Sequence, residues 1–159
     1  MNVRPEWNVR VALDTTILAA AEGVEGEARR LLATELVKKL PRHSTIVPVQ
    51  ALGELAFVLV RNVGRSPESA RAAVISWHDT FPVIGTSPEI LLAATDLFTR
   101  HRVSVWEAVI LSSAVAAGCQ LLLSLNYTEG RSPSGLTVTN PFAQPRHALL
   151  EMLLKASET

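Results

Sequence analysis

The sequence has little cysteine, little lysine and no net charge. Its single cysteine, Cys119, excludes an intrachain disulfide, and its apolar surroundings predict a buried, unreactive thiol. Lys and Arg total 15 and Asp and Glu also total 15, which excludes a protein that binds nucleic acid over its whole surface through a large positive charge. The bases are mostly Arg, which suits local contacts with phosphate.

A secretory leader and a membrane span are also lacking. The first ten residues, MNVRPEWNVR, contain no apolar run typical of a signal peptide, so we expect a cytoplasmic protein. Residues 108–125 are uncharged and approach the length of a membrane span. Small and polar residues interrupt this stretch: Ser112, Ser113, Gly118, Gln120 and Ser124. Gly118 divides it into a helix and a strand, and we therefore expect no membrane segment.

The composition predicts a globular protein. Of the 159 residues, 48% are hydrophobic and 19% are charged. That length suits one domain around a single core. We expect one domain over residues 1–159, with its core in about 10–142 and a last helix in about 146–156.

Short apolar runs alternate with segments of helical periodicity. The expected strands cover residues 9–13, 44–49, 81–85, 120–125 and 136–139. The expected helices cover the residues after Asp14 and then 25–40, 48–62, 66–78, 87–101, 104–118 and about 146–156. This alternation predicts an α/β fold with three layers, α/β/α, and a mostly parallel central sheet of four to five strands.

Polar residues follow two of the expected strands. Asp14 ends the first strand, and Asn126 follows the fourth. Ligands of open α/β sheets bind beyond the carboxyl ends of the strands, so the two residues could face each other if these strands are neighbours. Asp14 is also a preferred helix N-cap, and both interpretations stay open.

Two glutamates stand alone in apolar surroundings. Glu54 is the only charged residue between Ile46 and Val60, which favours a cleft over open solvent. Glu107 and Ser104, in the run SVWE, fit a capping box at the start of a helix. A capping role and a role in a site are compatible, because the first turn of this helix would face the same edge of the sheet.

Convergence of these side chains would favour a bound cation. Carboxylates that lie close together repel one another, and a divalent cation removes the repulsion. Oxygen ligands favour Mg²⁺ or Mn²⁺ over Zn²⁺, and the four histidines show no paired metal-ligand spacing. A cation at such a cleft suits phosphodiester hydrolysis.

Four segments, taken in order, resemble PIN domains of the VapC toxin kind. They are ALDTTIL (12–18), VQALGELAFVL (49–59), VSVWEAVILSSAVAAGCQLLLS (103–124) and GLTVTNPF (135–142). The resemblance covers about residues 10–142. It implies a PIN-like fold and a ribonuclease that depends on Mg²⁺ or Mn²⁺. It also implies three partners, namely an RNA substrate, a cognate antitoxin and a second copy of the chain.

The resemblance also implies site residues. The catalytic and metal-binding positions would be Asp14, Glu54, Glu107 and Asn126, supported by the hydroxyl groups of Thr15 and Ser124.

Glu107 and Asn126 depart from the family pattern, which usually has aspartate at both positions. Glu107 lengthens the arm by one methylene, which moves its carboxylate by roughly 1 Å, an error that can cost about 10²-fold in rate. Asn126 lacks the charge but keeps a carbonyl that can bind a hard cation. Glu129 is a possible substitute for Asn126, and Asp96 is expected on the solvated surface.

Other functions fit the same sequence. The departures favour a PIN-fold protein that binds RNA or a protein without cleaving. A phosphoaspartate enzyme with Asp14 as nucleophile would need a lysine at a strand end, and Lys38, Lys39 and Lys155 lie elsewhere. The apolar stripes of the helices in 21–40 and 66–101 could form a partner surface, although we expect most of these residues to cover the sheet.

Overall fold

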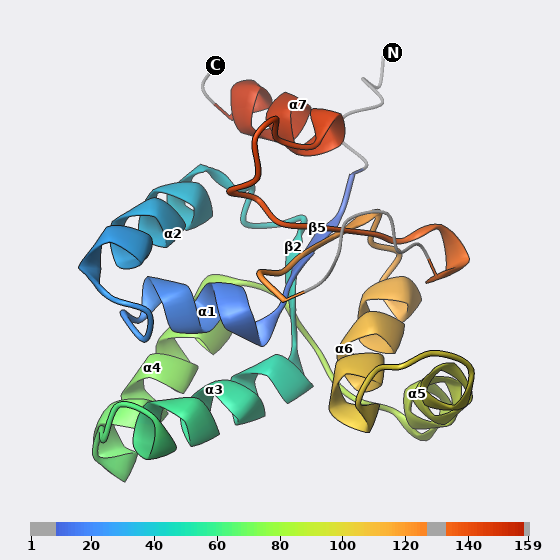
Figure 1. The fold of residues 1–159 in the computed structure, drawn as a ribbon, viewed down its shortest axis with the longest axis horizontal. Coiled ribbons are helices and arrows are strands. Elements are labelled where there is room, and N and C mark those ends of the chain that lie inside the picture. Colours follow the sequence, from blue (N-terminus) through green and yellow to red (C-terminus); the bar gives the residue numbers. More distant parts are fainter. Residues whose placement is uncertain (1–8, 127–132, 158–159) are drawn as a thin grey trace.

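The computed structural model describes residues 9–126 and 133–157 (Figure 1). Its strands are β1 (Val11–Leu13), β2 (Thr45–Pro48), β3 (Val83–Ile84), β4 (Leu121–Leu123) and β5 (Thr137–Thr139). Its helices are α1 (Thr15–Ala21), α2 (Glu27–Lys39), α3 (Val49–Arg61), α4 (Pro67–Thr80), α5 (Pro88–Arg100), α6 (Val105–Ala116) and α7 (Ala148–Ala156), with a 3₁₀ turn η2 (Pro133–Gly135). The predicted succession of strands and helices is confirmed, although each strand is shorter than its apolar run.

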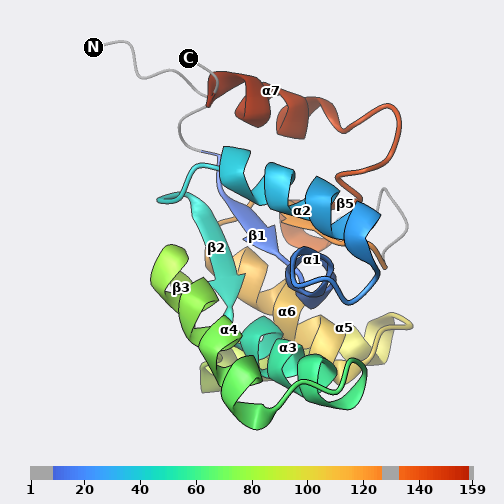
Figure 2. The same cartoon turned by 90° about the vertical axis from the view of Figure 1, so that its left-hand side faces the viewer.

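The five strands form one parallel sheet in the order β3-β2-β1-β4-β5. Figure 1 shows α1 and α2 on one side of this sheet and α5 and α6 on the other, and Figure 2 shows the same layers after a quarter turn. The residues of β1 and β4 are fully buried. A parallel sheet covered on both faces needs apolar residues at every position, which explains the uninterrupted runs VAL and LLL.

The apolar residues of α2 are only partly in the core. Leu31 and Leu32 of α2 are each 54% exposed, whereas Ala33, Leu36 and Leu40 are buried. The three buried residues follow one another at intervals of three and four, so only this narrow side of the helix meets the rest of the fold. Leu31 and Leu32 project beyond the contact and remain available on the surface.

The order in which strands are added to the sheet reverses between β1 and β4. The chain passes from β1 to β2 and β3 on one side, and then places β4 and β5 on the other. Strands β1 and β4 pair in parallel with Leu13 opposite Leu123, and the amide of Asp14 donates to the carbonyl of Leu123 at 3.0 Å. The two strands are thus neighbours, the condition under which the residues that follow them could meet, and Asp14 and Ser124 lie together at the carboxyl ends.

Glu22, at the end of α1, fixes the loop before α4. Its carboxylate accepts hydrogen bonds from Arg65 Nη1 at 2.9 Å and from the indole Nε1 of Trp77 at 3.2 Å. Arg65 also donates to the backbone carbonyl of Glu22 at 2.7 Å. These contacts hold α1, α4 and the loop between α3 and α4 together, and they satisfy the donor of a buried indole.

Replacing Glu22 by Ala should lower the free energy of unfolding by about 1–3 kcal/mol, because the indole of Trp77 would lose its acceptor inside the fold. Urea denaturation measures the change. Glu25→Ala is the matched control, since Glu25 is exposed and pairs with Arg29 only at 3.8 Å. An equal loss in both variants would contradict a special role for Glu22.

Cys119 is buried, and burial raises the pKa of its thiol to about 11. A thiol with so high a pKa carries almost no thiolate near neutral pH, which confirms the prediction of an inert cysteine. Among the described residues, no helix combines the length and the apolar character that a bilayer crossing requires.

Candidate acidic site at the carboxyl ends of the strands

Asp14 occupies the first position after β1 and is only 5% exposed. It is the N-cap of α1, and its Oδ2 accepts hydrogen bonds from Thr16 Oγ1 at 2.7 Å, Ser124 Oγ at 2.8 Å and the Thr16 amide at 3.4 Å. Burial raises the pKa of Asp14, and the hydrogen bonds from Thr16 and Ser124 oppose that shift. The carboxylate is thus held in a fixed direction by donors from α1 and from the end of β4.

Glu54 lies on α3 and is partly buried beside α1. Its Oε2 accepts a hydrogen bond from Thr15 Oγ1 at 2.7 Å. Burial raises the pKa of Glu54, and the negative charges of Asp14 and Glu107 raise it further, against the hydrogen bond from Thr15. Repulsion from two other acids shows that the three carboxylates belong to one electrostatic cluster.

Glu107 belongs to the predicted capping box at the start of α6. Its amide donates to Ser104 Oγ at 3.1 Å, and its Oε2 accepts from the Ser104 amide at 3.1 Å. The capping role is therefore confirmed. It occupies one carboxylate oxygen of Glu107, and the side chain still reaches the pocket described next.

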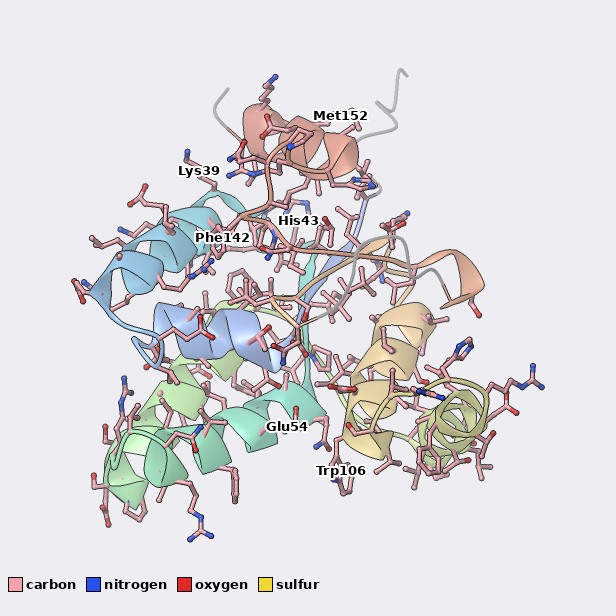
Figure 3. All side chains as sticks on the ribbon, in the orientation of Figure 1. Lys39, His43, Glu54, Trp106, Phe142 and Met152 are labelled. Carbon is pink, nitrogen blue, oxygen red and sulfur yellow. The ribbon has the colours of Figure 1, made fainter. Side chains whose placement is uncertain are left out.

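One pocket of about 270 Å³ contains all four predicted positions. It is lined by Asp14, Thr15, Thr16, Glu54, Phe57, Val58, Ser104, Glu107, Ile110 and Asn126. Figure 3 shows Glu54 on the part of α3 that faces the start of α6. Asn126 is exposed at the rim, and its backbone N–H donates a hydrogen bond to Ser124 Oγ at 3.2 Å. The pocket thus lies beyond β1 and β4, where the strand order reverses, the usual ligand position in such sheets.

The side chains of this pocket fit a hard divalent cation. The donors are oxygens, and the side-chain hydrogen bonds that orient the three acids run to Oδ2 of Asp14, Oε2 of Glu54 and Oε2 of Glu107. Within residues 9–126 and 133–157, no three His, Cys, Asp or Glu side chains surround a single point closely enough to ligate one ion together. This arrangement suits Mg²⁺, which is commonly held by one or two carboxylates and several waters.

Several residues of the pocket were not assigned to the site from the sequence. Thr16 donates to Asp14, and its Oγ1 also accepts from the Leu125 amide at 3.0 Å, so it ties α1 to the chain after β4. Its position two residues after an N-cap aspartate is the signal that would have indicated it. Ser104 and Phe57 line the pocket without having been singled out for it.

Of the two remaining acids considered from the sequence, Asp96 does not line the pocket of the acidic cluster. Asp96 is exposed and pairs with Arg100 at 3.4 Å, as expected for a surface residue. Glu129 lies outside the described residues. A second cavity of about 320 Å³, between α5 and α6, is lined mainly by apolar side chains together with Glu89 and Asp96, and lies apart from the acidic cluster.

Replacing Glu107 by Gln should separate its two roles. Glutamine at this position also completes a capping box, so the free energy of unfolding should stay within about 0.5 kcal/mol of wild type. The loss of the charge should weaken Mn²⁺ binding by about tenfold, the scale seen when a supporting group of a metal site is removed. Calorimetric titration with Mn²⁺ measures the affinity. If the affinity is unchanged, Glu107 serves as a helix cap only.

Comparisons with known proteins identify a family and a shared fold for the chain. Residues 11–127 match the PIN domain family. No curated protein matches the chain in sequence. Among solved structures, VapC20 of Mycobacterium tuberculosis, a toxin that cleaves the sarcin–ricin loop, is 23% identical with a TM-score of 0.63, and the match covers 73% of this chain and 89% of that one.

Two complexes show the same fold. A toxin–antitoxin complex from Klebsiella pneumoniae is 19% identical with a TM-score of 0.61. VapBC2 from Rickettsia felis, bound to a DNA fragment from its promoter, is 17% identical with a TM-score of 0.61. Each match covers 83% of this chain and 98% of the other.

Proposed function

Since the chain belongs to the PIN domain family, we propose that it is a metal-dependent endoribonuclease of the VapC toxin type. The observation that carries the proposal is the pocket at the reversal of the strand order that Asp14, Glu54, Glu107 and Asn126 share, where burial raises the pKa of Glu54 and the charges of Asp14 and Glu107 add to the shift. Repulsion of Glu54 by the charges of Asp14 and Glu107 is unfavourable, and a bound cation relieves it.

Asp14 and Glu54 would hold the cation, with Glu107 and the carbonyl of Asn126 completing the site directly or through water. A bound Mg²⁺ or Mn²⁺ supplies a polarised phosphate oxygen and a water of lowered pKa. Hydroxyl groups of the chain orient the carboxylates that would hold the cation. Thr15 fixes the orientation of Glu54, and Ser124 and Thr16 fix that of Asp14. Fixed donors and ligands reduce the reorganisation that the reaction requires.

The partners follow from the relatives. VapC20 cleaves the sarcin–ricin loop, and the other structures are toxin–antitoxin complexes. By likeness to them, we propose an RNA substrate and an antitoxin for this chain. We also propose a homodimer, which light scattering after size-exclusion chromatography tests. The exposed leucines of α2 and α5, Leu31, Leu32, Leu91 and Leu92, are consistent with a partner surface.

A second candidate is a PIN-fold protein that binds RNA without cleaving it. The observation that favours it is the neutral, exposed Asn126 at the rim of the pocket, which leaves the site with one negative charge fewer than the family pattern. Fewer anionic ligands lower the affinity for the cation. The cleavage assay below separates the two candidates.

Cleavage of RNA should require a divalent cation and should increase with pH. EDTA should abolish it, and excess Mn²⁺ should restore it. The pKa values of Asp14 and Glu54 are raised, so these carboxyl groups keep their protons at a pH where ordinary carboxyl groups have lost them. A protonated carboxyl group binds a cation poorly, and cleavage should therefore fall in mild acid, above the ordinary Glu pKa of 4.5.

The assay uses labelled single-stranded RNA with Mn²⁺ in excess over a series of pH values. RNA that stays intact at every pH, although the protein binds it, would favour the candidate that binds without cleaving. A rate that is equal with EDTA and with Mn²⁺ would overturn the metal-dependent mechanism.

A further inference from the structure

Two large aromatic side chains are exposed beside the acidic pocket. Phe57 is 62% exposed, lies three residues after Glu54 on α3 and lines the pocket itself. Trp106 is 53% exposed and directly precedes Glu107 in the first turn of α6. Figure 3 shows Trp106 projecting outward from the start of α6, beside the part of α3 that carries Glu54. Each of the two helices that supply the pocket's glutamates therefore carries an exposed aromatic ring, with Phe57 in the lining of the pocket and Trp106 next to Glu107 in the chain.

These rings are not needed for the core. Trp77 and Phe81 are buried and stack on each other with ring centroids 6.1 Å apart, whereas Phe57 and Trp106 leave more than half of their surface in water. Exposing an aromatic ring costs hydrophobic free energy that folding could otherwise gain. Isolated apolar residues on a surface are common, so the position of these two at the pocket, rather than their exposure alone, is what requires an explanation.

Positive charge accompanies the ring of Phe57 and shortly precedes α6 in the chain. The guanidinium of Arg61 lies 5.7 Å from the centroid of the Phe57 ring. Arg102 is exposed two residues before Ser104, which lines the pocket. Neither arginine forms an ion pair with a carboxylate in the described part of the chain. A phosphate chain that approaches three carboxylates meets repulsion, and cations at the rim offset it.

We propose that Phe57 and Trp106 stack on unpaired bases on either side of the phosphate at the pocket, while Arg61 and Arg102 contact the neighbouring phosphates. The inference rests on the proposed function, and it adds the side chains that would hold an unpaired RNA strand beside the pocket. Paired bases present no free face, whereas every unpaired base can stack on an aromatic ring. The rings would thus select unpaired RNA with little preference for sequence.

Binding of RNA tests the inference without cleavage. The probes are a fluorescent single-stranded RNA, an abasic strand of equal length and a blunt RNA duplex, each titrated with the full chain carrying Asp14→Asn in Mg²⁺. Phe57→Leu and Trp106→Leu should each weaken binding of the single strand by about tenfold, the scale of one stacked base. Binding of the abasic strand should stay unchanged. Phe98→Leu, which alters an exposed ring on α5, is the matched control and should have no effect.

Trp106 also supplies a direct signal. Stacking of a base should quench its fluorescence on addition of the single strand, and Trp106→Phe should lose this quenching while keeping most of the affinity, because it keeps a ring. Equal binding of the single strand by the Leu variants and the parent would overturn the inference and assign the rings to a protein partner. An equal loss for the abasic strand would show backbone contacts instead. If the parent protein fails to bind single-stranded RNA at all, the proposed function fails with it.

Discussion

Replacing Asp14 by Asn should lower the rate of RNA cleavage by about 10²-fold to 10³-fold, since a ligand of a catalytic cation is worth several kcal/mol in the transition state. Asp14 is the most buried acid of the pocket and is held by three hydrogen bonds. Asparagine keeps the shape, and its carbonyl can still cap α1. The fold should therefore survive, and circular dichroism and thermal denaturation verify that it does.

Asp96→Asn is the matched control for this prediction. Asp96 is exposed on α5 and pairs only with Arg100, so its replacement should leave cleavage within about twofold of wild type. Cleavage by Asp14→Asn at the wild-type rate would show that the reaction takes place elsewhere, or that a contaminating nuclease causes it.

Replacing Asn126 by Asp should increase the affinity for Mn²⁺ and the rate of cleavage at limiting Mn²⁺ by about tenfold each, because a fourth negative ligand joins the pocket. Asn126 is exposed at the rim, so a carboxylate there keeps contact with water and has little desolvation to overcome. Calorimetry gives the affinity, and the cleavage assay gives the rate over a series of Mn²⁺ concentrations.

Asn62→Asp separates a local effect from a change in net charge. Asn62 is exposed at the C-terminal end of α3 and does not line the pocket. The same added charge there should leave the Mn²⁺ affinity unchanged. A decrease in both affinity and rate for Asn126→Asp would mean that the neutral amide is part of a working site. An equal increase in Mn²⁺ affinity in both variants would show that the added net charge, and not a new ligand in the pocket, causes the effect.

The elements of this fold were predictable because a parallel sheet buried on both faces leaves a plain signal. The uninterrupted runs at β1 and β4 mark strands, and Ser-Pro-Glu at α4 and α5 marks the starts of helices, where Ser66 and Ser87 are the N-caps. The strand ends then indicated Asp14 and Asn126, because the carboxyl ends of parallel strands meet at one edge.

The features that could not be predicted from the sequence depend on the directions in which side chains point. Periodicity does not distinguish Leu32 from Leu36 on α2, because the side of the helix that meets the fold is set by tertiary contacts. Likewise, the capping box was legible from Ser104 and Glu107, but only the structure shows that the capping glutamate also lines the pocket with Glu54. The hydrogen bond from the Leu125 amide to Thr16 could not be foreseen, because it depends on β4 lying beside β1.

The most direct measurement is an anomalous difference map of crystals soaked in Mn²⁺. A shared cation should give a peak in the pocket, at roughly 2.0–2.2 Å from an oxygen of Asp14 and from one of Glu54, the range of hard-cation bonds to oxygen. A map with no peak there at saturating Mn²⁺, while the three acids keep their present hydrogen bonds, would contradict a shared cation and with it the proposed chemistry.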